Sequence, residues 1–283
     1  MLLANKADRF NTLRAVASPI VLFAPFVAGF PGGHGAFYFL LMFALIGETN
    51  YILHLHIHRS FGVGRKFNLL LDLAMGAATA FTASNWRIQH RYGHHCGVDE
   101  PFRAATWAME RFTPLGALHY SLRSIGPTFW HPVAIAFRKG VLANVKHPID
   151  YRWAFAEQAL MIALVIALAA WQPLMVLFYL LPWYVLIAAI TRYVDYLNHY
   201  GCDERSRDVF ARANNSVSRT FNWGCSNFGY HAAHHLRPDA HWTELPAIHA
   251  DIEHRIPRER IKAFTWSSLA FPYHCLLAWR GRI

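Results

Sequence analysis

Charged residues are scarce in this chain. Asp, Glu, Lys and Arg make up 16% of its 283 residues, while 54% are hydrophobic and 15% aromatic. An average soluble domain is about 25% charged, so this composition indicates a membrane protein. The length suits one domain better than two, and we predict a single domain over residues 1–283.

Cysteine is equally sparse, with four residues that lie far apart in the chain: Cys96, Cys202, Cys225 and Cys275. None of them forms a Cys-x-x-Cys pair. This argues against an iron–sulfur cluster, a rubredoxin-type site and a disulfide framework.

Acidic residues are outnumbered by basic ones, and the formal net charge is +10. Lys and Arg flank apolar segments instead of forming one stripe, so we expect no nucleic-acid partner. The charge suits an anionic leaflet or an acidic protein. The segment Met1 to Arg14 has no small-residue cleavage site before the apolar run that follows it. We therefore interpret that run as a retained anchor.

Four apolar runs are near the length of about 20 residues that crosses a bilayer. They cover about residues 15–30, 36–53, 154–171 and 173–193. The two connections within the pairs, at residues 31–35 and 172–173, contain no Lys or Arg. By the positive-inside rule these two hairpin tips face outward, and both termini lie in the cytoplasm.

The predicted fold is thus all-α, with about four transmembrane helices in two hairpins. Residues 15–199 are expected to be membrane-embedded or interfacial, and residues 200–283 to form a cytoplasmic cap. The apolar stretch Phe67 to Ser84 is almost long enough to span, yet both its ends should be cytoplasmic. We predict a re-entrant or interfacial helix there, bent at Gly76.

Histidine, in contrast, is abundant, and nine of the 18 histidines fall into spaced groups: His54 and His58; His90, His94 and His95; His199; and His231, His234 and His235. Residues four apart lie above one another on a helix. Imidazole nitrogen suits Fe, Zn, Cu and Ni, so the groups indicate a metal site. The predicted topology brings all of them to one membrane face, on the cytoplasmic side.

The order of these groups resembles the membrane fatty acid desaturase/hydroxylase superfamily, over roughly residues 35 to 250. The stretch from Gly229 to Asp239, followed by Leu245-Pro246, is similar to the third histidine box of acyl desaturases. Asp195-Tyr-Leu-Asn-His199-Tyr-Gly201 is instead similar to a stretch of the bacterial alkane hydroxylases.

The resemblance implies two non-haem iron ions, with O2 as co-substrate. It implies nine ligands: His54, His58, His90, His94, His95, His199, His231, His234 and His235. Asp195 stands where the family often has Asn, and Asn198 stands where alkane hydroxylases have Glu. Asp195 is our candidate catalytic residue, and it would ligate a metal, bond a water or orient His199.

Other polar residues have competing interpretations. His56 lies between two candidate ligands but points away from them on a helix, so we expect packing or substrate-side polarity there. Glu48 lies within the second apolar run and Asn50 one turn before His54. Each is either functional or a satisfied buried polar group.

The combined boxes favour desaturation of a fatty acyl chain, with hydroxylation of an alkyl or lipid substrate as the alternative. No flavin, haem or iron–sulfur motif is present, so a ferredoxin, rubredoxin or cytochrome is the expected electron donor. A zinc membrane hydrolase is less favoured because no His-Glu-x-x-His occurs. A metal transporter would need a polar path through the spans, which are mostly apolar.

Overall fold

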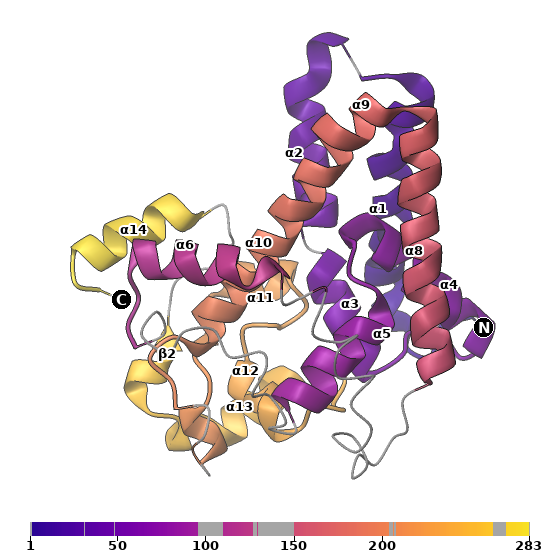
Figure 1. Cartoon of the computed structure of the whole chain (residues 1–283). Coiled ribbons are helices and arrows are strands. Elements are labelled where there is room, and N and C mark those ends of the chain that lie inside the picture. Colours follow the sequence, from indigo (N-terminus) through magenta and orange to yellow (C-terminus); the bar gives the residue numbers. More distant parts are fainter. Residues whose placement is uncertain are drawn as a thin grey trace. The chain divides into compact units, whose positions relative to one another are not determined.

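The computed structural model describes residues 2–30, 32–47, 49–95, 110–126, 129, 150–203, 206, 208–262 and 270–282 (Figure 1). The described chain is mostly helical. It forms two compact units, which we take separately. Unit 1 contains Met1–His94 and Phe129–Ala188, and unit 2 contains His95–Thr128 and Ala189–Ile283. The single domain expected over the whole chain stays a prediction.

Unit 1 consists of long apolar helices and the shorter segments packed against them. Its elements are η1 (Lys6–Asp8), α1 (Arg9–Ala28), η2 (Gly32–His34), α2 (Gly35–Ile46), α3 (Thr49–His58), α4 (Arg65–Thr79), α5 (Ala83–Trp86), η3 (Arg87–His94), α8 (Tyr151–Trp171), α9 (Pro173–Met175), η6 (Val176–Leu180) and the start of α10 (Leu181–His199). Helix α1 packs against α2, α3 and α4, and α8 packs against α4 and α5. These contacts bury Leu22, Leu53 and Leu71 completely or nearly so.

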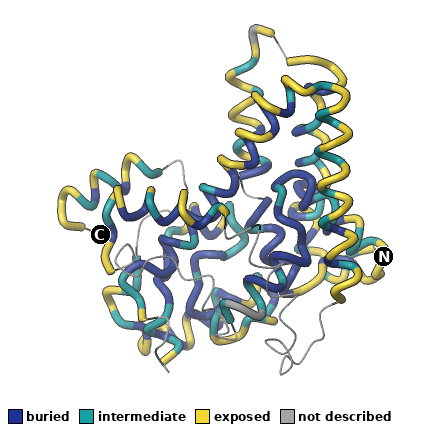
Figure 2. Tube along the Cα trace, viewed as in Figure 1, coloured by how far each residue is buried: buried dark blue, intermediate teal, exposed yellow. Residues whose placement is uncertain are grey.

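Four helical stretches of the described chain are long and apolar enough to cross a membrane, which confirms the four spans expected from the sequence. They are Lys6–Ala28, Gly35–His58, Tyr151–Trp171 and Pro173–His199. Only 11% of the apolar window of Tyr151–Trp171 is buried. Exposed residues follow this helix along its length (Figure 2), among them Leu160, Ile162 and Ile166. Such an apolar exterior suits hydrocarbon rather than water.

The stretch predicted to be re-entrant is a bent pair of helices. Helix α4 and the segment Ala83–Arg91 meet at 88°. The predicted bend at Gly76 is wrong, because the chain turns at Ala80, which adopts a left-handed φ of 60°. Thr79 donates to the Met75 carbonyl and accepts from the Phe81 N–H, which ends α4. A Cβ at Gly76 would lie 3.5 Å from the Phe81 carbonyl oxygen, which is ordinary van der Waals contact, so the turn does not require glycine at this position.

Unit 2 is made of shorter segments. Its elements are α6 (Pro114–Arg123), the end of α10, η7 (Val209–Ala211), β1 (Asn215–Ser216), α11 (Arg219–Gly224), α12 (His231–Leu236), α13 (Leu245–Ile252), η8 (Glu253–Arg255), η9 (Arg258–Arg260), β2 (Ile261–Lys262) and α14 (Phe271–Trp279). The two short strands pair in parallel, with Asn215 opposite Ile261. A buried cluster that includes Phe210, Leu245 and Ile252 packs α12 against α13.

Candidate functional site

Helix α3 of unit 1 carries His54 and His58, both of them buried. Their spacing of four residues puts both rings on one face, with ring centroids 5.0 Å apart. His90, from η3, joins them: its Nε2 lies 2.7 Å from Nε2 of His54. The ring nitrogens that His54, His58 and His90 offer all lie within 4.8 Å of one another. We call these three residues the unit 1 cluster.

The segment η3 that carries His90 and His94 is a π-helix, which the spacing alone did not predict. π-helical turns are rare and occur frequently at functional sites. The His90 and His94 rings stack with their centroids 5.1 Å apart. The Trp86 indole also stacks on the His90 ring, with ring centroids 5.7 Å apart and an angle of 11° between the ring planes. The indole thus covers one side of the cluster with an apolar surface.

In unit 2, His199 ends helix α10 and faces two histidines of α12. Its Nε2 lies 3.2 Å from Nε2 of His231, which lies 3.2 Å from Nε2 of His235. The Nδ1 of His199 is 3.0 Å from the Arg212 carbonyl oxygen. Because a carbonyl only accepts, Nδ1 carries the proton and Nε2 keeps its lone pair. His199, His231 and His235, whose offered nitrogens are within 4.8 Å of one another, form the unit 2 cluster.

His95 and His234 form a second pair of neighbouring histidines in unit 2, beside the unit 2 cluster. Their Nε2 atoms are 3.0 Å apart, and the His95 ring is 4.7 Å from that of His235. Burial lowers the pKa of His234 to about 3. The ring is therefore neutral near pH 7, which is the form that a metal ligand needs.

Three asparagines that sequence reasoning missed fix the backbone around the unit 2 cluster. Asn214 donates to the Leu197 and Tyr200 carbonyls at the end of α10. Asn215 accepts from the Ala232 N–H in α12, and Asn222 accepts from the Gly229 N–H. All three asparagines are buried. Asn214 and Asn215 are adjacent in the sequence and Asn222 stands apart, and none of the three belongs to a histidine box.

Gly229 precedes α12 at a point where no side chain fits. A Cβ at this position would lie 2.3 Å from the Ser216 carbonyl oxygen and 2.7 Å from Oδ1 of Asn222. Only glycine lets the backbone pass this closely to β1. The close approach sets where α12 begins, and hence where His231 lies.

The other polar candidates lie as follows. Asp195 accepts a hydrogen bond of 2.5 Å from the Tyr120 hydroxyl and one of 3.4 Å from Arg192, and it belongs to neither cluster. Asn198 is buried, as is Asn50, which lies one turn before His54. Glu48 lies outside the described residues. His56 points away from the unit 1 cluster and toward Asp72, as expected from its position on α3.

The clusters fit a metal ion by their donor chemistry. Imidazole nitrogens bind first-row metals at about 2.1 Å, so two ligands of one ion are at most about 4.2 Å apart. Nitrogens already within 4.8 Å of one another need only small side-chain rotations to share an ion. Of the nine predicted ligands, unit 1 contains His54, His58, His90 and His94, and unit 2 contains His95, His199, His231, His234 and His235.

Comparison with known protein families gives one match. The family model described as fatty acid desaturase matches residues 28–267. No curated protein and no solved structure matches the chain. The matched range includes all nine histidines and Asp195.

Proposed function

The chain belongs to the fatty acid desaturase family, and on this premise we propose that it introduces a double bond into the alkyl chain of a fatty acyl lipid. The reaction would use O2 and two non-haem iron ions. The observation that carries the proposal is the gathering of histidine nitrogens, in each unit, in a chain with four candidate membrane spans. Iron bound to such nitrogens supplies the oxidation that removes hydrogen from an unactivated C–H bond.

The residues of the chain would contribute positioning and dryness. His54, His58, His90 and His94 would hold metal from unit 1, and His95, His199, His231, His234 and His235 would hold it from unit 2. The Arg212 carbonyl keeps the His199 ring in the tautomer whose Nε2 can bind a metal. The stacked indole of Trp86 keeps water from one side of His90. Asp195 would then orient His199 or bond a water.

Hydroxylation of an alkyl or lipid chain is the second candidate. It is favoured by the stretch Asp195 to Gly201, which is similar to the alkane hydroxylases, and by the polar Tyr120–Asp195 pair one turn before His199. The products differ in mass: desaturation removes two hydrogens and hydroxylation adds one oxygen. Mass spectrometry of the lipid products therefore decides between the two reactions.

We further propose that the histidines and both termini face the cytoplasm, because the two predicted hairpin tips contain no Lys or Arg. A ferredoxin, rubredoxin or cytochrome would supply the electrons. The excess of basic residues favours docking of an acidic donor protein.

Lipid profiling of cells that express the protein tests the proposal. We expect His94→Ala to lower the amount of product by more than about 100-fold, beyond the loss typical of residues that only support a ligand. His119→Ala is the matched control, because His119 belongs to no histidine box, and it should leave the profile unchanged. Identical profiles for the wild type and His94→Ala, at equal protein levels, would contradict the proposal.

Metal analysis of anaerobically purified protein separates the remaining classes. We expect about two iron ions per chain. A single zinc ion would instead favour a hydrolase.

A further inference from the structure

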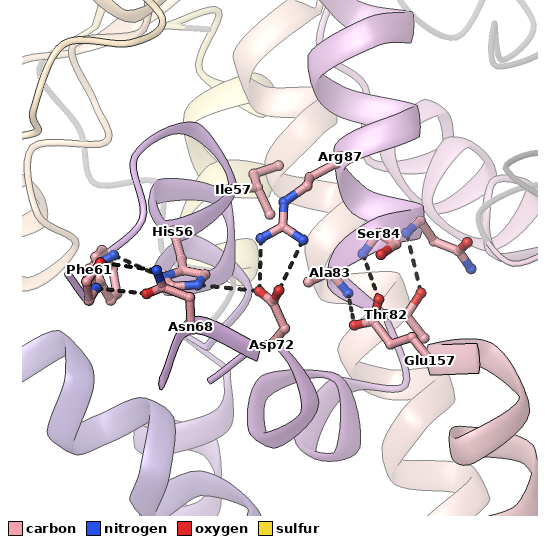
Figure 3. A network of polar contacts seen from close by, with 12 residues as sticks. His56, Ile57, Phe61, Asn68, Asp72, Thr82, Ala83, Ser84, Arg87 and Glu157 are labelled. Carbon is pink, nitrogen blue, oxygen red and sulfur yellow. Dashed lines mark hydrogen bonds and ion pairs between the residues drawn. The ribbon is translucent and has the colours of Figure 1, made fainter. Parts of the chain in front are cut away.

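A buried carboxylate of unit 1 contacts both segments that carry the unit 1 cluster. Asp72, on α4, is 2% exposed. Arg87, the first residue of η3, donates to both of its oxygens at 3.0 and 2.9 Å. Nε2 of His56, on α3, lies 3.3 Å from Oδ1 of Asp72. Figure 3 shows the three side chains, with Asp72 between the other two.

The tautomer of His56 follows from its second contact. The Phe61 N–H donates to Nδ1 of His56 at 3.2 Å, so Nδ1 has no proton. The proton of the neutral ring is therefore on Nε2, the atom that faces Asp72. His56 is completely buried, with Nδ1 bonded to the Phe61 N–H and Nε2 facing the Asp72 carboxylate. It joins α3 to the carboxylate on one side and to the turn after α3 on the other.

The neighbours of these residues in the sequence are the candidate ligands. His56 lies between His54 and His58 on α3, and its ring leaves the opposite side of the helix. Arg87 lies three residues before His90 in η3. Fixing His56 and Arg87 on one carboxylate therefore fixes how far α3 and η3 can slide or turn against each other. The 2.7 Å approach of His54 to His90 depends on that register.

A second carboxylate holds the same segment from another direction. Glu157, on α8, is completely buried, and its two oxygens accept from the N–H groups of Ala83 and Ser84 at 2.9 and 3.0 Å. These groups belong to the start of α5, which leads directly into η3 (Figure 3). Glu157 thus anchors the segment but makes no link to α3. Asp72, in contrast, contacts side chains of both α3 and η3.

We propose that Asp72 is a positioning residue of the metal centre, which holds His54, His58 and His90 at metal-binding distance through His56 and Arg87. This inference rests on the proposed function, since it presupposes metal at the unit 1 cluster. It assigns no contact of Asp72 with metal or substrate. Removing a group bonded directly to a metal ligand typically lowers metal affinity by about 10- to 100-fold, and we take this range as the upper limit for Asp72.

The test is metal binding by the full-length protein in detergent. Apo-protein is titrated with Fe²⁺ and with Co²⁺ against a competing chelator, and the Co²⁺ absorption spectrum reports ligand geometry. For Asp72→Asn we expect the affinity for one of two metal ions to fall by as much as about 10- to 100-fold, with the other unchanged. The Co²⁺ spectrum of the weakened site should change as well.

Tyr184→Phe is the matched control. The Tyr184 hydroxyl donates to the Ala77 carbonyl at 2.7 Å, so this variant removes a buried hydrogen bond to the same helix, α4, without touching His56 or Arg87. We expect both metal affinities and the Co²⁺ spectrum to stay at wild-type values. Equal loss of metal from both variants would reduce Asp72 to a general structural role and overturn the inference.

Arg87→Lys is the second test variant, for use if the Asp72→Asn protein does not fold and accumulate in cells. Lysine keeps the charge but cannot bond both carboxylate oxygens as the guanidinium does, so the same metal ion should be weakened. Wild-type affinities and spectrum in either variant overturn the inference while the proposed function stands. A wild-type protein that binds no metal would instead refute the proposed function itself.

Discussion

The segments that carry the histidines are held by carboxyl side chains in unit 1 and by amide side chains in unit 2. In unit 1, Asp72 accepts from Arg87 and faces His56, and Glu157 accepts from two backbone N–H groups. In unit 2, Asn214 and Asn215 bond the backbone around His199 and α12. The difference follows from the elements: long helices satisfy their own backbone, whereas short segments leave many N–H and C=O groups that need partners.

The two units also differ in what they expose. Helix α8 of unit 1 exposes apolar side chains along its length, as a helix in contact with lipid would. A charged side chain inside such a unit cannot reach water and needs a partner within the protein. Asp72 and Arg87 provide this for each other. Asp72 is buried and Arg87 is partly exposed, so removing Arg87 would leave the carboxylate buried alone, which is costly. Unit 1 therefore depends on complete pairing, while unit 2 depends on backbone fit.

The apolar exterior of unit 1 gives the largest expected effect. Ile162 is 52% exposed near the middle of α8, and Ile162→Arg would put a charge at the centre of a span, at a cost of about 3 kcal/mol. Trp223 of unit 2 is 90% exposed, and Trp223→Arg should change stability by no more than about 0.5 kcal/mol. Yield of folded, membrane-extracted protein measures both. Equal yields would contradict the proposed contrast between the two exteriors.

A substitution at Gly229 tests the close backbone packing of unit 2. Gly229→Ala puts a Cβ against the Ser216 carbonyl, and we expect a loss of about 1–3 kcal/mol in the free energy of unfolding. The shift of α12 should also weaken metal binding at His231. Gly224→Ala is the control, because a Cβ there meets nothing within 4 Å. Thermal unfolding with metal analysis checks both variants, and wild-type behaviour of Gly229→Ala would refute the argument from close approach.

Local pattern was enough to predict much of this structure. The apolar runs predicted four spans because length and hydropathy are properties of one continuous segment. The spacing of His54 and His58, and of His231 and His235, predicted shared faces because helix geometry is local. The structure gathers each of these pairs within its own unit. The side of the membrane and the identity of the metal stay predictions.

Contacts between distant residues were beyond the sequence. Asp72 meets His56 and Arg87 only because α3, α4 and η3 pack together, and no motif marks such a meeting. The predicted bend at Gly76 is wrong because the hydrogen bonds of Thr79 end the helix later. The π-helical form of η3 was missed because the i+4 spacing of His90 and His94 is also that of an α-helix.

The Tyr120–Asp195 bond gives the smallest expected effect and tests whether a carboxylate matters in unit 2 as it does in unit 1. Asp195 is partly exposed, so solvent screens the bond, and Tyr120→Phe should cost only about 1 kcal/mol. If the Tyr120 hydroxyl sets how Asp195 faces His199, the turnover rate falls by less than about tenfold while metal content stays constant. Tyr273→Phe is the control, because the Tyr273 side chain on α14 is exposed. Loss of metal from Tyr120→Phe would instead give Asp195 the same supporting role that we infer for Asp72, and an unchanged rate would leave Asp195 outside the reaction.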